Sequence, residues 1–277
     1  LVAKGWPLSV MAHRNRKPVD ELVAMGASEV ETPAEMAARS DIVFICVTAS
    51  GQVEEVVAGP DGLLDGAAPG MIVVDTSTAD PNSTLMLAEK CAARGVRLAD
   101  APLGGTPEGA HAGALSAMVG ADEETYAAIE PAIMAWAAKS VRLGPVGTGH
   151  KMKLINNFVS MGYGAIYAEA LSTAAKVGIS PRVFDSVIRG SRMDCGFYQT
   201  YMRWVLERDP EAHRFALRNA HKDMRYFVAM ENAAGIVNPV GAVVKNAFAQ
   251  AEAAGHGDDD LPKISDIVAA ANGVKLA

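Results

Sequence analysis

Residues 147–157 read Gly-Thr-Gly-His-Lys-Met-Lys-Leu-Ile-Asn-Asn. Two glycines open this stretch, and a helical run follows in which Lys153 and Asn157 are four residues apart. Because residues with this spacing share one face of a helix, both side chains should point the same way. An ammonium group beside a carboxamide can donate a proton and hydrogen-bond to one substrate oxygen, so we expect Lys153 and Asn157 to bind substrate and to be catalytic. The alternative is an ordinary helix start with a surface lysine and a capping asparagine.

Upstream of this stretch, short β-rich runs alternate with helical ones. Residues 41–47 are continuously apolar after Asp41, as in a parallel strand buried on both faces. Such alternation indicates an α/β fold with a doubly wound sheet and right-handed crossovers. We expect strands at 8–13, 28–31, 41–47, 71–76, 96–101, 116–120 and 141–143, and helices at 18–25, 33–38, 52–58, 81–94 and 122–138.

Downstream of residue 147 the strand signals stop, and the sequence predicts an all-α domain. It begins with a long helix at 149–177, which carries more small and apolar residues than two flanking domains can cover. We therefore expect a homodimer or homotetramer, and a domain boundary between residues 146 and 147. Further helices are expected at 181–191, 198–207, 217–234, 239–253 and 259–271.

Composition excludes several classes of partner. The chain has 277 residues and a net charge of −7, which disfavours nucleic acid and anionic membrane surfaces. No apolar run approaches the roughly 18 residues of a membrane span. Three well-separated cysteines, Cys46, Cys91 and Cys195, favour a reducing compartment over disulfides or zinc, so we expect a cytoplasmic protein. The acidic run 258–260 is interpreted as a charged helix start, and no metal site is expected.

Four motifs along the chain carry a resemblance to a known family. The pattern Gly-x-Gly-x-x-x-Lys-x-x-Asn-Asn resembles the active-site segment of the β-hydroxyacid dehydrogenases, which include 3-hydroxyisobutyrate dehydrogenase and tartronate semialdehyde reductase. Residues 100–110, Asp-Ala-Pro-Leu-Gly-Gly-Thr-Pro-Glu-Gly-Ala, align without gaps to the family's Asp-Ala-Pro-Val-Ser-Gly-Gly-x-x-Gly-Ala. The exposed amides of such a turn suit a carboxylate. The resemblance therefore implies that Leu103, Gly104, Gly105 and Thr106 bind the substrate.

This loop departs from the commoner family pattern at two positions. Gly104 replaces the serine, and Thr106 replaces the second glycine of the pair. The Gly-x-Thr order resembles the subgroup that contains sulfolactaldehyde reductase, in which an arginine stands where this chain has Gly105. We expect a more open loop that accepts a bulkier or more polar acid than hydroxyisobutyrate.

The resemblance also implies a nicotinamide cofactor. Val47 and Thr48 follow a buried strand, and residues 75–81 resemble a Ser-Thr-x-x-Pro element whose threonine, here Thr78, lies near the nicotinamide. The run 221–224, His-Lys-Asp-Met, resembles a Lys-Asp-Leu element, so Lys222 is expected to reach the cofactor. A helix cap at Thr78 and a surface ion pair at Lys222 are the alternatives.

The segment from His13 to Arg16 bears on the choice between NAD and NADP. NAD-binding enzymes usually place an acidic residue after the second strand, for the ribose 2′-hydroxyl, and this chain has none before Asp20. Instead His13, Arg14 and Asn15 occupy the Asn-Arg-Thr positions of NADP-using relatives. Arg14 and Arg16 could bind a 2′-phosphate through charge-assisted hydrogen bonds. We expect NADP, with NAD as the second choice and a solvated basic turn as the alternative.

A dinucleotide-binding domain normally begins with a strand, a Gly-x-Gly-x-x-Gly turn and a helix that receives the pyrophosphate. This sequence starts near the end of that helix, so we expect the functional protein to have about twenty further N-terminal residues. The predicted architecture is a Rossmann-type domain, residues 1–146, which binds NADP and lacks its first strand and turn in this sequence. An all-helical domain, residues 147–277, should bind substrate and form the dimer contacts.

The resemblance implies an oxidoreductase that transfers a hydride between NADP(H) and a small β-hydroxyacid or its semialdehyde. Lys153 would be the general acid and base, and Asn157 would orient the substrate. One alternative is an imine reductase, but Lys153 argues against it because those enzymes generally carry another residue there. The other is a non-catalytic chromatin-type homologue, against which the retention of Lys153 and Asn157 and the acidic charge both argue.

Overall fold

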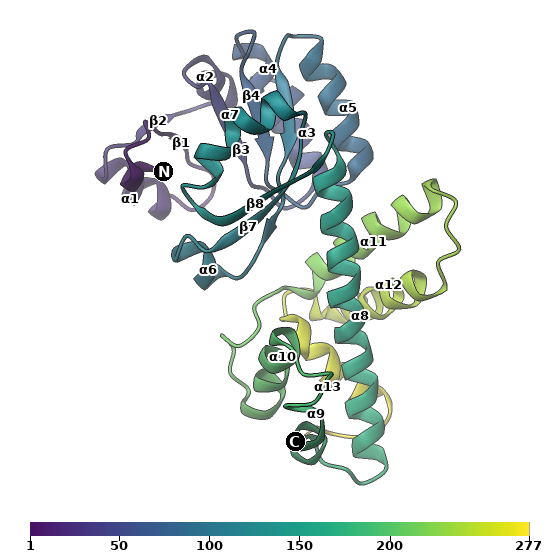
Figure 1. Cartoon of the computed structure of the whole chain (residues 1–277). Helices are drawn as coiled ribbons and strands as arrows, with labels where there is room; N and C mark the ends of the chain where they lie inside the picture. Colours follow the sequence, from purple (N-terminus) through teal and green to yellow (C-terminus); the bar gives the residue numbers. More distant parts are fainter. Residues whose placement is uncertain (277) are drawn as a thin grey trace. The chain divides into compact units, whose positions relative to one another are not determined.

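The computed structural model describes residues 1–276 (Figure 1). It divides into two compact units, unit 1 (Leu1–Lys153) and unit 2 (Leu154–Ala277). Unit 1 is a Rossmann-like α/β unit and unit 2 is helical, which confirms the predicted fold class. The expected boundary lies between residues 146 and 147, whereas the two units divide after Lys153, within the helix that begins at Thr148. The functional roles of the two parts remain predictions. Among the described residues, no helix is long and apolar enough to cross a membrane.

Unit 1 contains a six-stranded mixed sheet and a separate two-stranded parallel sheet. Its strands are β1 (Ser9–Met11), β2 (Ser28–Val30), β3 (Ile42–Ile45), β4 (Ile72–Asp75), β5 (Arg97–Asp100), β6 (Leu103–Gly104), β7 (Leu115–Gly120) and β8 (Ala137–Gly144). The helices are α1 (Lys17–Ala24), α2 (Pro33–Ala38), α3 (Ser50–Ala58), α4 (Leu63–Gly66), α5 (Pro81–Ala92), α6 (Pro107–His111) and α7 (Glu123–Ile133). Strands β3, β4 and β5 are parallel, β7 is antiparallel to β5 and β6, and β8 is parallel to β7.

The sheet is interrupted between β1 and β3. Strands β1 and β2 form a separate parallel pair, and the six-stranded sheet begins at β3. A cavity of about 410 Å³ separates them, lined on one side by Leu8 and Ser9 and on the other by Ile42 and Phe44. The carboxyl ends of β3, β4 and β5 nevertheless lie in register at one edge.

Both faces of β4 are covered, whereas β3, where the apolar run predicted burial on both faces, has Ile42 and Phe44 only partly buried beside the cavity. On β4, Val73 packs into a cluster with helices α3, α4 and α5, whereas Ile72 and Val74 pack into a second cluster with α7. Successive residues of a strand point to opposite faces, so a strand buried on both sides needs an unbroken apolar sequence. Val73 and Val74 are fully buried.

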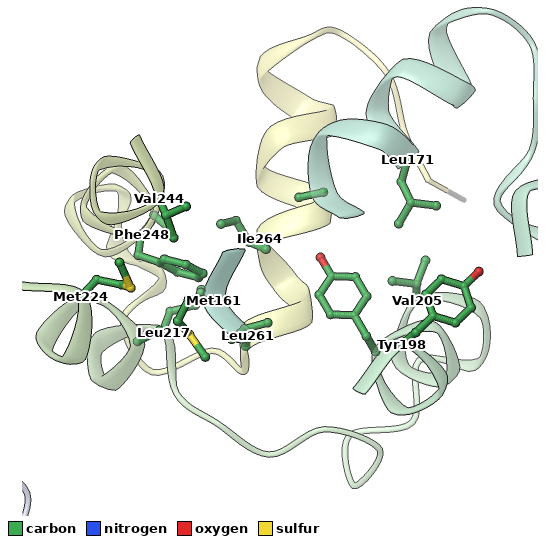
Figure 2. Close-up of a cluster of buried hydrophobic side chains, with 14 of the residues drawn as sticks. Met161, Leu171, Tyr198, Val205, Leu217, Met224, Val244, Phe248, Leu261 and Ile264 are labelled. Carbon is green, nitrogen blue, oxygen red and sulfur yellow. The ribbon is translucent and has the colours of Figure 1, made fainter. Parts of the chain in front are cut away.

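Unit 2 is a helical assembly around one apolar core. Helix α8 (Thr148–Lys176) begins in unit 1 and continues into unit 2, followed by α9 (Pro181–Ile188), α10 (Gly196–Glu207), α11 (Leu217–Ala233), α12 (Pro239–Ala251) and α13 (Ile264–Ala271). Figure 2 shows the buried side chains, among them Met161 and Leu171 of α8, Met224 of α11 and Phe248 of α12. Large side chains that are fully excluded from water contribute most of the stabilisation of such a core.

Several expected boundaries are wrong, and three short elements were not predicted. The helix expected at 181–191 ends at Ile188, and the one expected at 259–271 begins as an α-helix at Ile264. The helix expected at 122–138 ends at Ile133, and Ala137 and Ala138 belong to strand β8 instead. The cause is tertiary, because β8 pairs with β7 along its length and Ala137 is buried against the sheet. Strand pairing can override the local helix preference of alanine. The unpredicted elements are α4, β6 and α6.

Candidate active site

The segments expected to contact the cofactor follow two neighbouring parallel strands. Ile45 at the end of β3 is in register with Asp75 at the end of β4. The Val47 amide donates to Ser77 Oγ at 3.0 Å, which joins the segment after β3 to the segment after β4. Open α/β sheets bind ligands at the carboxyl ends of their parallel strands. Val47, Thr48 and Thr78 therefore lie at an edge that suits a dinucleotide.

In the turn after β1, Arg16 already has carboxylate partners within the protein, which the sequence did not suggest. Arg16 donates to both carboxylate oxygens of Glu29, at 2.9 and 3.0 Å, and to Asp20 at 3.1 Å. These hydrogen bonds raise the pKa of the Arg16 guanidinium and lower the pKa of the Glu29 carboxyl. A 2′-phosphate would have to compete with this exposed network for Arg16. Arg14 is exposed and has no ion-pair partner in the described part of the chain, so it is the better candidate.

Sequence reasoning missed the role of Glu29, although a signal was present. Glu29 lies on β2, and it pairs in register with Val10 of β1. Two parallel strands joined by a short helix bring their residues side by side, so an acidic residue on the second strand can reach the turn after the first. His13 and Asn15 are exposed in the same turn, and Asn15 Oδ1 accepts from the Lys17 amide at 3.1 Å.

The segment expected to bind the substrate acid consists of strand β6 and the residues that lead from it to the N-terminus of α6. Leu103 and Gly104 form β6, and Gly104 pairs with Ser116 of β7. The Thr106 hydroxyl caps α6 and accepts from the Gly109 amide at 3.2 Å. Gly105 has a φ of 131°, a conformation that favours glycine. The loop shape therefore depends on the glycine at 105.

The space beside Gly104 is bounded by Ser116. A Cβ built on Gly104 would lie 2.6 Å from Ser116 Oγ, so the Ser116 hydroxyl occupies the space that a side chain at 104 would take. Ser116 Oγ donates to the Gly104 carbonyl at 3.3 Å. The sequence analysis considered the loop alone, whereas the antiparallel partner strand brings a hydroxyl against it; the tolerance of a bulkier or more polar acid stays a prediction.

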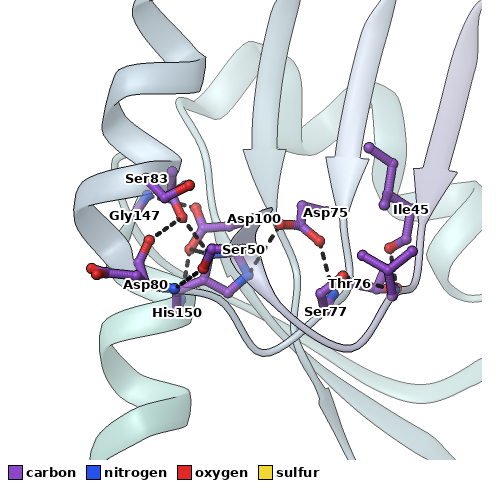
Figure 3. Close-up of polar contacts among 12 residues, drawn as sticks. Ile45, Ser50, Asp75, Thr76, Ser77, Asp80, Ser83, Asp100, Gly147 and His150 are labelled. Carbon is purple, nitrogen blue, oxygen red and sulfur yellow. Dashed lines mark hydrogen bonds and ion pairs between the residues drawn. The ribbon is translucent and has the colours of Figure 1, made fainter. Parts of the chain in front are cut away.

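The start of helix α8 is fixed by a buried carboxylate (Figure 3). Asp100, at the end of β5, accepts from the Gly147 amide through Oδ1 and from the His150 amide through Oδ2, each at 2.6 Å. Burial raises the pKa of Asp100, although the His150 ring and the two amide bonds act in the opposite direction. Gly147 has a φ of 90°, and a Cβ on Gly149 would lie 2.9 Å from Asp100 Oδ2. These contacts explain both glycines of the Gly-x-Gly pattern.

Asn157 and Lys222 meet at one carboxylate in unit 2. Asn157 Nδ2 donates to Asp223 Oδ2 at 2.7 Å, and both side chains are buried. Lys222 Nζ lies 3.1 Å from Asp223 Oδ1 and 5.6 Å from the centre of the Tyr226 ring. The Asn157 carbonyl oxygen accepts from Asn156 Nδ2 at 3.4 Å, and its second lone pair can accept from another donor. The sequence analysis assigned no role to Asp223. Its position directly after Lys222 was the signal that could have indicated one.

Family models match almost the whole chain. Residues 1–144 match the NAD binding domain of 6-phosphogluconate dehydrogenase, and residues 147–268 match the NAD-binding domain of NADP-dependent 3-hydroxyisobutyrate dehydrogenase. The chain is 30% identical to 2-(hydroxymethyl)glutarate dehydrogenase of Eubacterium barkeri, over 94% of this chain and 86% of the relative. It is 29% identical to 3-sulfolactaldehyde reductase of Escherichia coli K12, over 99% and 92%. The structure of 3-hydroxyisobutyrate dehydrogenase from Salmonella typhimurium aligns with a TM-score of 0.82 at 26% identity, covering 92% of this chain and 90% of that one.

Two further similarities bear on the alternative functions. The human cytokine-like nuclear factor N-PAC is 29% identical over 95% of this chain, but the match spans only 47% of that protein's length. An imine reductase from Bacillus cereus aligns with a TM-score of 0.60 at 20% identity, over 96% of this chain and 92% of that one. At that identity, the likeness shows a shared fold alone.

Proposed function

Because the chain belongs to the β-hydroxyacid dehydrogenase family, we propose that it transfers a hydride between NADP(H) and a small β-hydroxyacid or its semialdehyde. Family membership makes it an NAD(P)-dependent oxidoreductase; the choice of NADP, the substrate and the residue roles are proposed. The observation that supports the roles most is Asn157. It lies four residues after Lys153 on α8, and its carboxamide is oriented by the buried Asp223.

A bound nicotinamide would supply or accept the hydride. Lys153 would donate a proton to the carbonyl oxygen during reduction, and the neutral amine would accept it during oxidation. An amine with an ordinary pKa of about 10.4 is almost entirely protonated at neutral pH and rarely available as a base, so oxidation by this route needs burial or neighbouring cations that favour the neutral amine. The carbonyl oxygen of Asn157 would accept from the substrate hydroxyl or from Lys153, which keeps the proton donor and the substrate oxygen aligned.

The acid group of the substrate would bind to Leu103, Gly104, Gly105 and Thr106. Gly105 and Thr106 are exposed, so the backbone and the Thr106 hydroxyl can reach a ligand. Ser116 Oγ lies beside Gly104 but donates its proton to the Gly104 carbonyl, so the hydroxyl donor of the loop is Thr106. Exposed backbone amides and one hydroxyl would suit a polar acid, and the substrate class proposed is therefore small carboxylates or sulfonates with a β-hydroxyl or aldehyde group.

Selectivity for NADP would come from the turn after β1. Arg14 would bind the 2′-phosphate, and Asn15 and His13 would contribute hydrogen bonds. Val47, Thr48 and Thr78 would contact the cofactor at the strand ends, and Lys222 is proposed as a further cofactor contact. Glu29 already engages Arg16, so Arg16 contributes less in this proposal than Arg14.

The test is a panel of C3–C5 hydroxyacids and semialdehydes assayed on the full chain with both cofactors, comparing Lys153→Ala with Lys151→Ala. Lys151 is an exposed lysine two residues earlier on the same helix and is the matched control. Loss of general acid–base catalysis costs about 10²–10⁴-fold, so kcat should fall by that factor for Lys153→Ala alone. Retention of more than a tenth of the original kcat would exclude Lys153 as the acid and base.

The same panel, extended with cyclic imines, tests the alternatives. An imine reductase would reduce cyclic imines faster than any semialdehyde. A non-catalytic homologue would turn over no member of the panel with either cofactor.

A further inference from the structure

The geometry points to Asp100 and His150 as positioning residues, which hold the first turn of α8, and with it Lys153, in place for proton transfer. The inference rests on the proposed role of Lys153. It concerns two fully buried side chains of unit 1 that are not among the residues proposed to touch cofactor or substrate.

Asp100 performs a task that a residue at the helix start normally performs. A helix usually begins with a side chain that accepts from its own first-turn amides. Here the Thr148 hydroxyl donates to the Pro145 carbonyl at 2.7 Å, and the Gly147 and His150 amides are bound by Asp100 from strand β5. Bonds from amides to a carboxylate are stronger than neutral ones, and a negative charge is favourable at a helix N-terminus. The sheet itself therefore caps α8.

Two glycines bring this cap within reach. A Cβ on Gly149 would lie 2.8 Å from the Asp100 carbonyl oxygen, and a Cβ on Gly120 would lie 2.9 Å from Asp100 Cγ and from the Gly149 amide nitrogen. The backbones of β5, β7 and α8 thus approach around one carboxylate, with no side chain between them that could yield. The first turn of α8 has little freedom to shift relative to the sheet.

His150 ties the same turn to a second set of elements (Figure 3). Its Nδ1 lies 2.7 Å from the Thr84 hydroxyl of α5. Its ring lies between two carboxylates, with Nε2 3.8 Å from Asp75 Oδ2 and Nδ1 3.8 Å from Asp100 Oδ2. Within the described residues, Nε2 has no hydrogen-bond partner, so the Thr84 bond is the one that orients the ring.

The network therefore joins α8 to the two segments that would hold the reactants. The segment after β4 carries Thr78, and the segment after β5 carries the loop from Leu103 to Thr106. Lys153 lies one helical turn after His150. A shift of the first turn would move its ammonium group relative to both segments, and misplacement by about 1 Å can cost roughly 100-fold in rate.

The first test is Asp100→Asn. The amide has the shape of the carboxylate, but it offers one oxygen and one NH₂ group, so one of the two backbone amides loses its acceptor. We expect kcat to fall roughly 10- to 100-fold with the KM for the cofactor unchanged. Asp122→Asn is the matched control, because Asp122 caps α7 in the same unit by accepting from the Thr125 amide at 2.7 Å. It should lower Tm and leave kcat unchanged.

The deciding measurement repeats Asp100→Asn in a Lys153→Ala background, with hydride transfer followed by cofactor absorbance at high enzyme concentration. If Asp100 acts through Lys153, the second substitution causes no further loss of the residual rate. An equal loss in both backgrounds would show a merely structural role and overturn the inference, as would an unchanged kcat for Asp100→Asn alone. Full activity of Lys153→Ala would overturn the proposed role of Lys153 itself, and this inference with it.

A second pair of variants covers the case in which Asp100→Asn does not fold. His150→Asn keeps a polar atom near the position of Nδ1 for the Thr84 bond, whereas His150→Leu removes it. We expect His150→Asn to retain most of the kcat and His150→Leu to lose it roughly tenfold or more, with the loss absent in the Lys153→Ala background. Equal kcat values for the two variants would contradict the positioning role of His150.

Discussion

His213 should make the stability of unit 2 depend on pH. It lies between α10 and α11, with Nδ1 2.9 Å from the Thr200 hydroxyl and its ring 4.8 Å from the centre of the Phe197 ring. Burial lowers the pKa of His213 from 6.5 to about 4. Between these values the unfolded chain binds a proton that the folded chain excludes, so stability falls as pH falls from about 6.5 towards 4.

The size of the effect follows from the two pKa values. With 6.5 for the unfolded and about 4 for the folded state, linkage gives a loss of about 2 kcal/mol at pH 5 and about 3 kcal/mol once both states are protonated. His213→Gln keeps a hydrogen-bonding group for Thr200 but carries no titrating charge. The difference in unfolding free energy between pH 7 and pH 5 should therefore shrink by about 2 kcal/mol in the variant.

The assay is urea unfolding at pH 7 and pH 5, followed by fluorescence, on the wild-type chain and on His213→Gln. The comparison must be between the two chains, because burial also raises the pKa values of Asp100 and Asp260. A raised carboxyl pKa acts with the opposite sign: its contribution to stability is present at low pH and is lost as pH rises through the folded value. An identical pH dependence in the two chains would refute the burial argument for His213.

Three further predictions concern the cofactor, the oligomer and the substrate loop. Arg14→Ala should raise the KM for NADPH far more than the KM for NADH, and equal effects would mean that the turn does not read the 2′-phosphate. Light scattering should show a dimer or larger at micromolar concentration, and Ile166→Glu, a charge on an exposed apolar position of α8, should shift it towards monomer; a stable wild-type monomer would exclude the idea. Gly105→Ala should lower Tm because its φ of 131° disfavours a side chain, whereas Gly162→Ala, inside α8 with no atom within 4 Å of the new Cβ, should raise it; shifts of the same sign would contradict the backbone argument.

The order of elements could be predicted because their signals are local. The apolar run after Asp41 became strand β3, whose Val43 and Ile45 are buried, and prolines 33, 81, 181 and 239 each mark the first residue of a helix. The error at Ala137 has a different origin. Alanine favours a helix locally, and only pairing with β7 makes residues 137 and 138 part of a strand. Local preference cannot supply that information.

The site residues could be named from motifs, but their surroundings could not. The sequence indicated Lys153 and Asn157 through their spacing, yet it did not reveal that Asp223 orients Asn157. The sequence predicted that Arg16 binds the cofactor, but it did not reveal that Glu29 accepts two hydrogen bonds from Arg16. Each omission is a contact between residues far apart in the chain, and such contacts carry no periodic signature.

Contacts between distant residues explain why two glycines precede Lys153. From the sequence, the two glycines read only as a turn. Gly147 is needed for its positive φ, and Gly149 is needed because a side chain there would meet Asp100, a residue nearly fifty positions earlier. Asp100 in turn begins the run that aligns to the substrate loop. Two of the family motifs, the one that begins at Asp100 and the one that begins at Gly147, are therefore in direct contact. A substitution in either motif should change the structure of the other.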